Sequence, residues 1–214
     1  MPKIVDHVAM RQQIAKIACQ TIANSGLENT TIREVARAAG CSTGFITHYF
    51  PYKNALVIAA IKYVSARQLE NMGKVAEFQP GDIFAIFLRG LPIEEEDKIA
   101  FKVWLALWSM SCTNIELASV QRQIHRDYLG FYSTTLLNSG VLNADDELLN
   151  QAERISLMIN GLSIQALHNP FFWSAERLAS EFEVILRQTF PLWAGIKPDN
   201  CGPSSLLVPE SVTP

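Results

Sequence analysis

The sequence predicts an all-α protein of nine helices arranged in two domains. Apolar residues recur at helical spacing along most of the 214 residues, and no run shows the strict alternation of a half-buried strand. No segment repeats at the period of a solenoid. Hydrophobic residues make up 49% of the chain and charged residues 18%, which is typical of a globular protein. We therefore expect helices packed around an apolar core.

The first helix is predicted by an apolar stripe that stops at a glycine. Met10, Ile14 and Ile17 lie at i, i+4 and i+7, so they share one face of a helix. The segment NSG follows the stripe, and its Gly26 is a natural C-terminal cap because glycine adopts the left-handed conformation easily. We therefore expect this helix to end near Gly26.

Two short helices should follow, separated by a tight turn. Thr31 and Glu34 form the capping-box pattern, in which each side chain satisfies an amide of the first helical turn. Gly40 ends that helix, and Ser42 can cap the next one, over residues 43–49.

Six further helices are predicted after residue 52 from capping residues, helix-breaking Gly and Pro residues, and apolar periodicity. Their expected bounds are Lys53 to about Ala76, a short helix within 81–90, an acid-led helix within 94–112, about Asn114 to Asn138, a helix capped by Asn143 or Asp145 that ends near His168, and a helix capped by Ser174 that ends near Leu192.

The chain divides into a basic head, an acidic body and a tail. We expect a head over 1–52, a body over 53–196 and a disordered tail rich in Pro and Ser over 197–214. Residues 1–62 hold seven basic and three acidic residues, a net charge of +4, whereas the remainder holds 11 basic and 18 acidic residues, a net charge of −7. A basic head on an acidic body suggests that the head binds a polyanion.

The two short helices have the pattern of a helix-turn-helix, at about 31–50. Ala36 is small enough for the next helix to approach, Gly40 supplies the turn, and Ile46 fills the angle between the helices. This arrangement presents the second helix to the DNA major groove. The predicted DNA contacts are Thr31, Arg33, Ser42, Thr43, Gly44, Thr47, His48, Tyr49 and Lys53. The alternative is an ordinary helical corner with a polar surface.

A specific family resemblance supports the DNA-binding interpretation. The segment TIREVARAAGCSTGFITHYFPYKNAL, residues 31–56, resembles the DNA-binding motif of the TetR family of bacterial transcriptional regulators. The resemblance implies a homodimer that binds a palindromic operator in double-stranded DNA. It also implies that a small-molecule effector releases the repressor from the operator.

The body resembles a narrower group within that family. The segments AFKVWLALWSMS and RLASEFEVILRQTF look like the C-terminal domain of the choline-responsive repressor of glycine-betaine synthesis and its relatives. That subfamily tends to show Asp-Gly-Leu-Trp where this chain has Asn160, Gly161, Leu162 and Ser163. A possible anionic group and an aromatic wall are therefore missing. A choline-like quaternary amine is one expected effector, and an unrelated apolar or aromatic ligand is the alternative.

Aromatic residues of the body could enclose that effector. The candidates are Phe101, Trp104, Trp108, Tyr128, Phe131 and Trp173. Ring faces attract cations, and pockets form between the helices of a bundle. Asn114, Glu116, Gln165 and His168 are possible polar contacts. The alternative is that these rings fill the core.

The last two helices should form the contact between subunits. The predicted interface residues are Ile155, Met158, Ile159, Leu162, Phe182, Ile185 and Leu186. Two such helices from each subunit would make a four-helix interface. Packing of the same stripe within one subunit is the alternative.

Other classes of protein are less consistent with the sequence. No G-x-S-x-G, phosphate loop or H-E-x-x-H occurs, so we expect neither an enzyme nor a cofactor. The Cys and His residues lack metal-ligand spacing, so no metal site is expected. No apolar run approaches the about 18 residues that cross a bilayer, and no signal peptide is evident, so we expect a cytoplasmic protein without membrane contact. A helical small-molecule carrier would explain the body but not the head.

Overall fold

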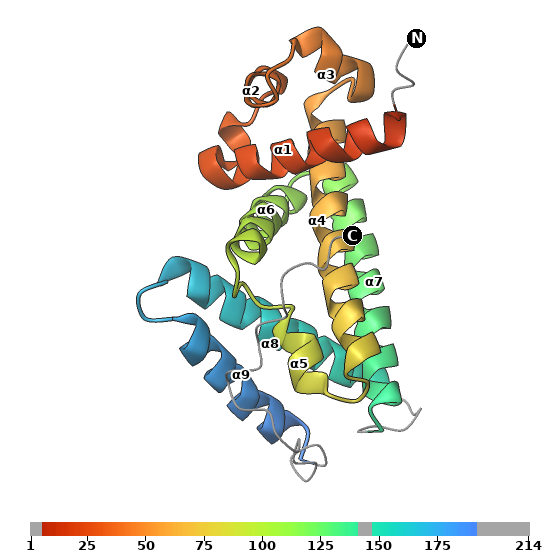
Figure 1. Ribbon diagram of the computed structural model, residues 1–214, viewed down its shortest axis with the longest axis vertical. Coiled ribbons are helices and arrows are strands. Elements are labelled where there is room, and N and C mark those ends of the chain that lie inside the picture. Colours follow the sequence, from red (N-terminus) through yellow and green to blue (C-terminus); the bar gives the residue numbers. More distant parts are fainter. Residues whose placement is uncertain (1–5, 141–146, 192–214) are drawn as a thin grey trace, which may run out of the picture.

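The computed structural model describes residues 6–140 and 147–191 (Figure 1). Within these ranges the chain forms nine α-helices and no β-strand, which confirms the predicted all-α fold. The helices are α1 (His7–Asn29), α2 (Ile32–Ala38), α3 (Thr43–Tyr49), α4 (Lys53–Phe78), α5 (Ile83–Leu88), α6 (Glu95–Ser111), α7 (Ile115–Asn138), α8 (Leu148–His168) and α9 (Ala175–Thr189). None of these helices is long and apolar enough to span a membrane.

Local signals set the bounds of the first helices. The chain leaves helical geometry at Gly26, whose φ is 75°, so the long part of α1 ends where the sequence predicts. Thr31 Oγ1 accepts a hydrogen bond from the Glu34 amide at 3.1 Å and starts α2. The Glu34 carboxylate pairs with Arg37 Nη2 at 2.6 Å, so only the Thr31 half of the predicted capping box forms.

Helix α4 joins the three-helix end of the molecule to the rest. Its buried residues extend from Leu56 to Met72. Figure 1 shows α1 lying across α4 and α6, with α2 and α3 beyond α1, and α7 running beside α4. Buried residues as far apart as Ile46 in α3 and Phe182 in α9 belong to one continuous apolar core. Helix α4 therefore packs against α1 at one end of this core and against α5, α6 and α7 in the rest of it.

The last helices differ slightly from the expected bounds. Helix α9 ends at Thr189 instead of near Leu192, and Phe190 has φ −125° and ψ 77°. Pro191 explains the early end, because a proline disfavours helical geometry in the residue before it. The predicted caps of α8, Asn143 and Asp145, and the tail over 197–214 lie outside the described residues.

Candidate nucleic-acid interface and effector cavity

The turn between α2 and α3 has the geometry of a helix-turn-helix. Gly40 has a φ of 64°, a left-handed conformation that other residues adopt only with strain. The Cys41 amide donates to the Ala36 carbonyl at 3.0 Å, and Ser42 Oγ accepts from the Phe45 amide at 3.1 Å. Ile46 is fully buried in the angle between the helices. The turn thus fixes α3 at the outer end of the molecule (Figure 1).

Most of the predicted DNA contacts form an exposed polar surface, which we call the α3 surface. Its residues are Thr31, Arg33, Ser42, Thr43, Gly44, Thr47 and His48, and all seven are exposed. Hydroxyl, imidazole and guanidinium groups of this kind bind phosphates and base edges. A Cβ added at Gly44 would meet only Ser42 Oγ, at 3.8 Å, so the backbone there is open to a close approach.

The other two predicted contacts, Tyr49 and Lys53, have partners inside the protein. Lys53 Nζ donates to the carbonyl oxygens of Leu27 at 2.7 Å and Glu28 at 3.2 Å, so it holds the end of α1. The Tyr49 ring packs against His48 and is only 7% exposed. An Ala substitution at either residue would disturb the head as well as any DNA contact. These two residues therefore make poor tests of DNA recognition.

One neighbour of the α3 surface, the amino end of α1, could not be predicted from the sequence. The His7 ring, at the start of α1, lies 6.0 Å from the His48 ring and 5.6 Å from the Tyr49 ring, between centroids. Arg11, one turn further along α1, donates to the Tyr49 carbonyl and places its guanidinium 4.4 Å from the centre of the Phe50 ring. The amino end of α1 therefore supports α3, a contact between segments some 40 residues apart that periodicity could not predict.

Four of the six predicted ligand-binding aromatics line one cavity in the body. Phe101, Trp104 and Trp108 come from α6, and Tyr128 comes from α7. The cavity holds about 390 Å³ of empty space, part of it open to solvent. The ring of Trp104 lies 6.3 Å from that of Trp108 and 6.0 Å from that of Tyr128. Three ring systems thus lie together on the wall of this cavity, which we call the effector cavity because it is the candidate site for an effector.

The other predicted ligand residues lie elsewhere. Phe131 is half-buried beside the Tyr132 ring, and Trp173 packs against Phe172 and Arg177. None of the four possible polar contacts lines the effector cavity: Asn114, Glu116, Gln165 and His168. Helical spacing placed these residues on plausible faces, but it could not tell which faces meet.

The polar wall of the effector cavity contains a buried chain of hydrogen bonds. Gln68 of α4 donates from Nε2 to the Gly90 carbonyl at 2.9 Å, and its Oε1 accepts from Tyr128 Oη at 2.7 Å. Burial raises the pKa of Tyr128 well above its ordinary value, so the hydroxyl keeps its proton and donates. The chain links α4 directly to the ring that faces the cavity.

Further polar residues of the wall follow the helical repeat of α7. His125 and Gln121 lie one turn and two turns before Tyr128, respectively, and all three line the cavity. His125 Nε2 lies 3.0 Å from Glu153 Oε1, and Asn160 Nδ2 donates to Ser156 Oγ at 3.4 Å. Counting back from Tyr128 by three and seven residues would have found His125 and Gln121. Gln68 carries no such signal, since its partners are distant in sequence.

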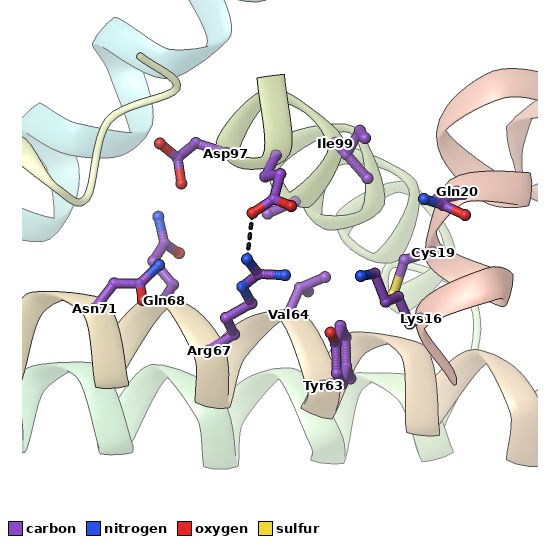
Figure 2. Close-up of a pocket in the computed structure, with 12 residues that line it drawn as sticks. Lys16, Cys19, Gln20, Tyr63, Val64, Arg67, Gln68, Asn71, Asp97 and Ile99 are labelled. Carbon is purple, nitrogen blue, oxygen red and sulfur yellow. Dashed lines mark hydrogen bonds and ion pairs between the residues drawn. The ribbon is translucent and has the colours of Figure 1, made fainter. Parts of the chain in front are cut away.

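A second cleft lies between α1, α4 and α6, where the head meets the body (Figure 2). Arg67 of α4 forms an ion pair with Glu96 of α6, drawn as a dashed line in Figure 2. Cys19 donates its thiol proton to the Ala60 carbonyl, and burial raises its pKa to about 12, so the thiol stays neutral. Gln68 lines this cleft as well as the effector cavity.

Asp97 in this cleft gives a pH-dependent prediction. Burial raises its pKa, so above that pKa the ionised carboxylate lowers the stability of the fold, and this cost fades as the pH falls through the raised pKa. We expect Asp97→Asn to raise the unfolding midpoint by about 2–4 °C at pH 7, with no gain left near pH 4. Thermal unfolding across that range measures the difference. Glu95→Gln, an exposed control on the same turn, should give no gain, and a gain independent of pH would contradict the explanation.

The predicted subunit contact needs correcting. Ile155, Ile159, Leu162, Phe182 and Leu186 are buried within one subunit, and Met158 and Ile185 are only partly exposed. The apolar stripe that the sequence places between subunits is therefore mostly core, because α8 and α9 turn it towards their own subunit. Other apolar side chains of this region remain exposed, namely Leu157, Phe171, Phe172 and Val184.

Comparison with known proteins identifies the class. The model described as "Bacterial regulatory proteins, tetR family" matches residues 14–60, which contain the helix-turn-helix. The model described as "BetI-type transcriptional repressor, C-terminal" matches residues 82–190, half of the chain. The chain therefore belongs to the TetR family of DNA-binding transcriptional regulators. Within that family, its body is of the BetI repressor type. An enzyme and a carrier without DNA binding are both set aside by this result.

Individual relatives agree over most of the chain. The transcriptional regulator PksA of Bacillus subtilis is 27% identical over 183 residues, which is 83% of this chain and 88% of PksA. BetI of Serratia proteamaculans is 27% identical over 194 residues, 88% of this chain and 96% of BetI. Both are similar along the head and the body together.

Solved structures share the fold. A transcriptional regulator from Rhodococcus sp. Rha1 superposes with a TM-score of 0.74 at 23% identity, over 88% of this chain and 99% of that one. A regulator from Saccharomonospora viridis, solved with choline, gives 0.71 at 22% identity, over 84% and 96% of the two chains. At this level of identity the similarity concerns the fold.

Proposed function

We propose that this regulator is a repressor that binds operator DNA through the α3 surface and leaves it when a small molecule fills the effector cavity. The observation that carries the proposal is the Gln68 side chain. It lies on α4, which begins at the head, and it is hydrogen-bonded to Tyr128 on the cavity wall. Any ligand that displaces Tyr128 must also disturb α4.

The mechanism follows from this connection. Effector binding shifts α4 relative to α1, against which it packs, and so changes the separation of the two α3 helices in a dimer. Two recognition helices fit a palindromic site only when their spacing matches successive major grooves. The effector needs only a higher affinity for the form whose spacing does not match.

The domains and the location in the cell are part of the same proposal. The head covers 1–52, the body 53–196 and the tail 197–214, with α4 as the first element of the body. The protein acts in the cytoplasm, where its operator lies. The second subunit packs on the exposed side of α8 and α9, with Leu157 and Val184 in the contact, because these apolar side chains are 68% and 47% exposed in one subunit.

The aromatic wall supports an organic cation as the effector. Trp104, Trp108 and Tyr128 offer ring faces that attract positive charge. The choline bound to the Saccharomonospora viridis regulator is a cation of this kind. An uncharged apolar or aromatic ligand is the second candidate, which the apolar side chains of Phe101 and Ile159 in the same wall favour.

Binding to the DNA that flanks the protein's own gene tests the regulator. We expect purified protein at about 0.1 M salt to bind a site there about 10³-fold more tightly than a scrambled duplex of equal length. Fluorescence anisotropy with both duplexes measures the ratio, and the affinity should fall steeply as salt is added. If no flanking fragment bound more tightly than the scrambled duplex, the proposal that the protein binds an operator beside its own gene would be wrong.

A further inference from the structure

We infer that the effector cavity takes a compact amine whose ammonium group still carries N–H donors, and that it discriminates against quaternary amines. The inference rests on the proposed function, because it assigns a chemical class to the effector of that cavity. Three observations carry it: the orientation of a buried amide, the acceptors on the wall that lack donors, and the charge of the wall.

The Gln68 amide fixes the direction of the hydrogen bonds at the wall. The Gly90 carbonyl can only accept, so the Gln68 nitrogen must face it, at 2.9 Å. The Gln68 oxygen therefore faces Tyr128 Oη, at 2.7 Å, and the hydroxyl must donate its one proton there. What Tyr128 can still offer a ligand is the lone pairs of its oxygen, which only accept.

Two other polar side chains of the wall, Gln121 and Asn160, also offer acceptors. Gln121 Oε1 is buried and has no hydrogen-bond partner among the described residues. Asn160 uses its Nδ2 on Ser156, which leaves its Oδ1. Including Tyr128, three side chains on the wall can accept, and one of them, Gln121, already lacks a donor.

The wall has acceptors and rings but no formal negative charge. Among the described residues that line the cavity there is no Asp, Glu, Lys or Arg. The carboxylate of Glu153 is engaged by His125 and does not line the cavity. The attraction for a cation must therefore come from the ring faces and from neutral oxygen acceptors.

This combination separates three kinds of ligand. A primary or secondary ammonium gains from the rings and also donates its N–H groups to the waiting acceptors. A quaternary ammonium gains from the rings alone and leaves buried acceptors such as Gln121 Oε1 without donors, which is unfavourable. A neutral alcohol supplies one donor and no charge. Only the ammonium with N–H groups uses both the ring faces and these acceptors.

A methylation series tests the inference with one change at a time. Ethanolamine, N-methylethanolamine, N,N-dimethylethanolamine and choline are all cations at pH 7 with one hydroxyl, and each methyl group removes one N–H donor. Calorimetric titration of the full chain should give affinities that fall along the series, with ethanolamine at least about tenfold tighter than choline. Choline as the tightest ligand, equal affinities, or no binding by any member would each overturn the inference. So would a neutral alcohol that binds more tightly than ethanolamine.

The Gln121→Leu substitution provides a second, independent readout. Removing a buried acceptor that has no partner should raise the unfolding midpoint by about 2–4 °C without ligand. The same change should weaken ethanolamine about tenfold and leave choline almost unchanged, so the preference disappears. Gln123→Leu, on the solvent side of the same helix, should alter neither preference nor cavity. A purely structural role for Gln121 predicts the higher midpoint with the preference intact, which would overturn the inference.

The two proposals fail in different ways. If the four amines bind with affinities in the expected order but none of them releases the protein from its operator, the proposed function is contradicted and the inference is supported. If choline binds most tightly of the four amines and releases the protein from its operator, the proposed function is supported and the inference is overturned.

Discussion

The Gly44→Glu substitution is expected to weaken operator binding by at least about 100-fold while the fold stays as stable as before. Gly44 lies in the first turn of α3, in the middle of the α3 surface. A Cβ there meets only Ser42 Oγ at 3.8 Å, so the side chain adds no strain, and an acid in a first helical turn is favourable. On DNA, however, the new carboxylate would occupy the place where the backbone approaches the phosphates.

The measurement is operator affinity by fluorescence anisotropy, with thermal unfolding of the same sample. Gly130→Glu is a matched control, because Gly130 is an exposed helical glycine of α7 and an added Cβ there meets nothing within 4 Å. It should be as stable as the natural chain, or more so, and keep its operator affinity. A Gly44→Glu protein that binds the operator normally would show that α3 does not approach the DNA at its first turn.

The head could be predicted from sequence because its signals are local. Thr31 and Ser42 cap helices that begin at the next residue, and Gly40 adopts the left-handed turn that its lack of a side chain permits. Each signal acts over three or four residues, so it can be recognised without knowing the rest of the structure. The roles of Tyr49 and Lys53 depend instead on α1, and the sequence motif suggested DNA contacts for both.

Most residues predicted for the contact between subunits are buried within one subunit, for a related reason. An apolar stripe on α8 shows that one face is buried, but not what buries it. Ile155 and Ile159 face the core of their own subunit, whereas Leu157, between them, faces outward. A protein core and a dimer interface have similar amino-acid compositions. Periodicity alone therefore cannot tell whether an apolar stripe packs within one subunit or against a second one.

The effector cavity was predicted in part, and the missing part is polar. The spacing of Trp104 and Trp108 on α6 identified one aromatic wall. The bonds from Gln68 to Gly90 and from Tyr128 to Gln68 join residues 22 and 60 positions apart, and such pairs leave no mark in a single sequence. Because polar groups decide which ligand fits an aromatic cavity, the sequence could suggest a pocket but not its chemistry.

The Leu157→Glu substitution is expected to separate the dimer and, with it, to weaken operator binding by at least about 100-fold. Leu157 is 68% exposed on α8, so a carboxylate there is solvated in the single subunit and the fold should keep its stability. In the proposed dimer the same side chain is covered, and burying two unpaired carboxylates related by symmetry is strongly unfavourable. A single head then has to bind half an operator without the help of its partner.

Light scattering after gel filtration would give the mass, and anisotropy the operator affinity. Ile115→Glu is the control, since Ile115 is an apolar residue at the start of α7, outside α8 and α9, and is 86% exposed. It should remain a dimer that binds DNA. Leu157→Glu should show the mass of one subunit with an unchanged helical spectrum. A Leu157→Glu protein that stays dimeric would place the contact on another face of the molecule, and the spacing argument for effector release would then have to start from that face.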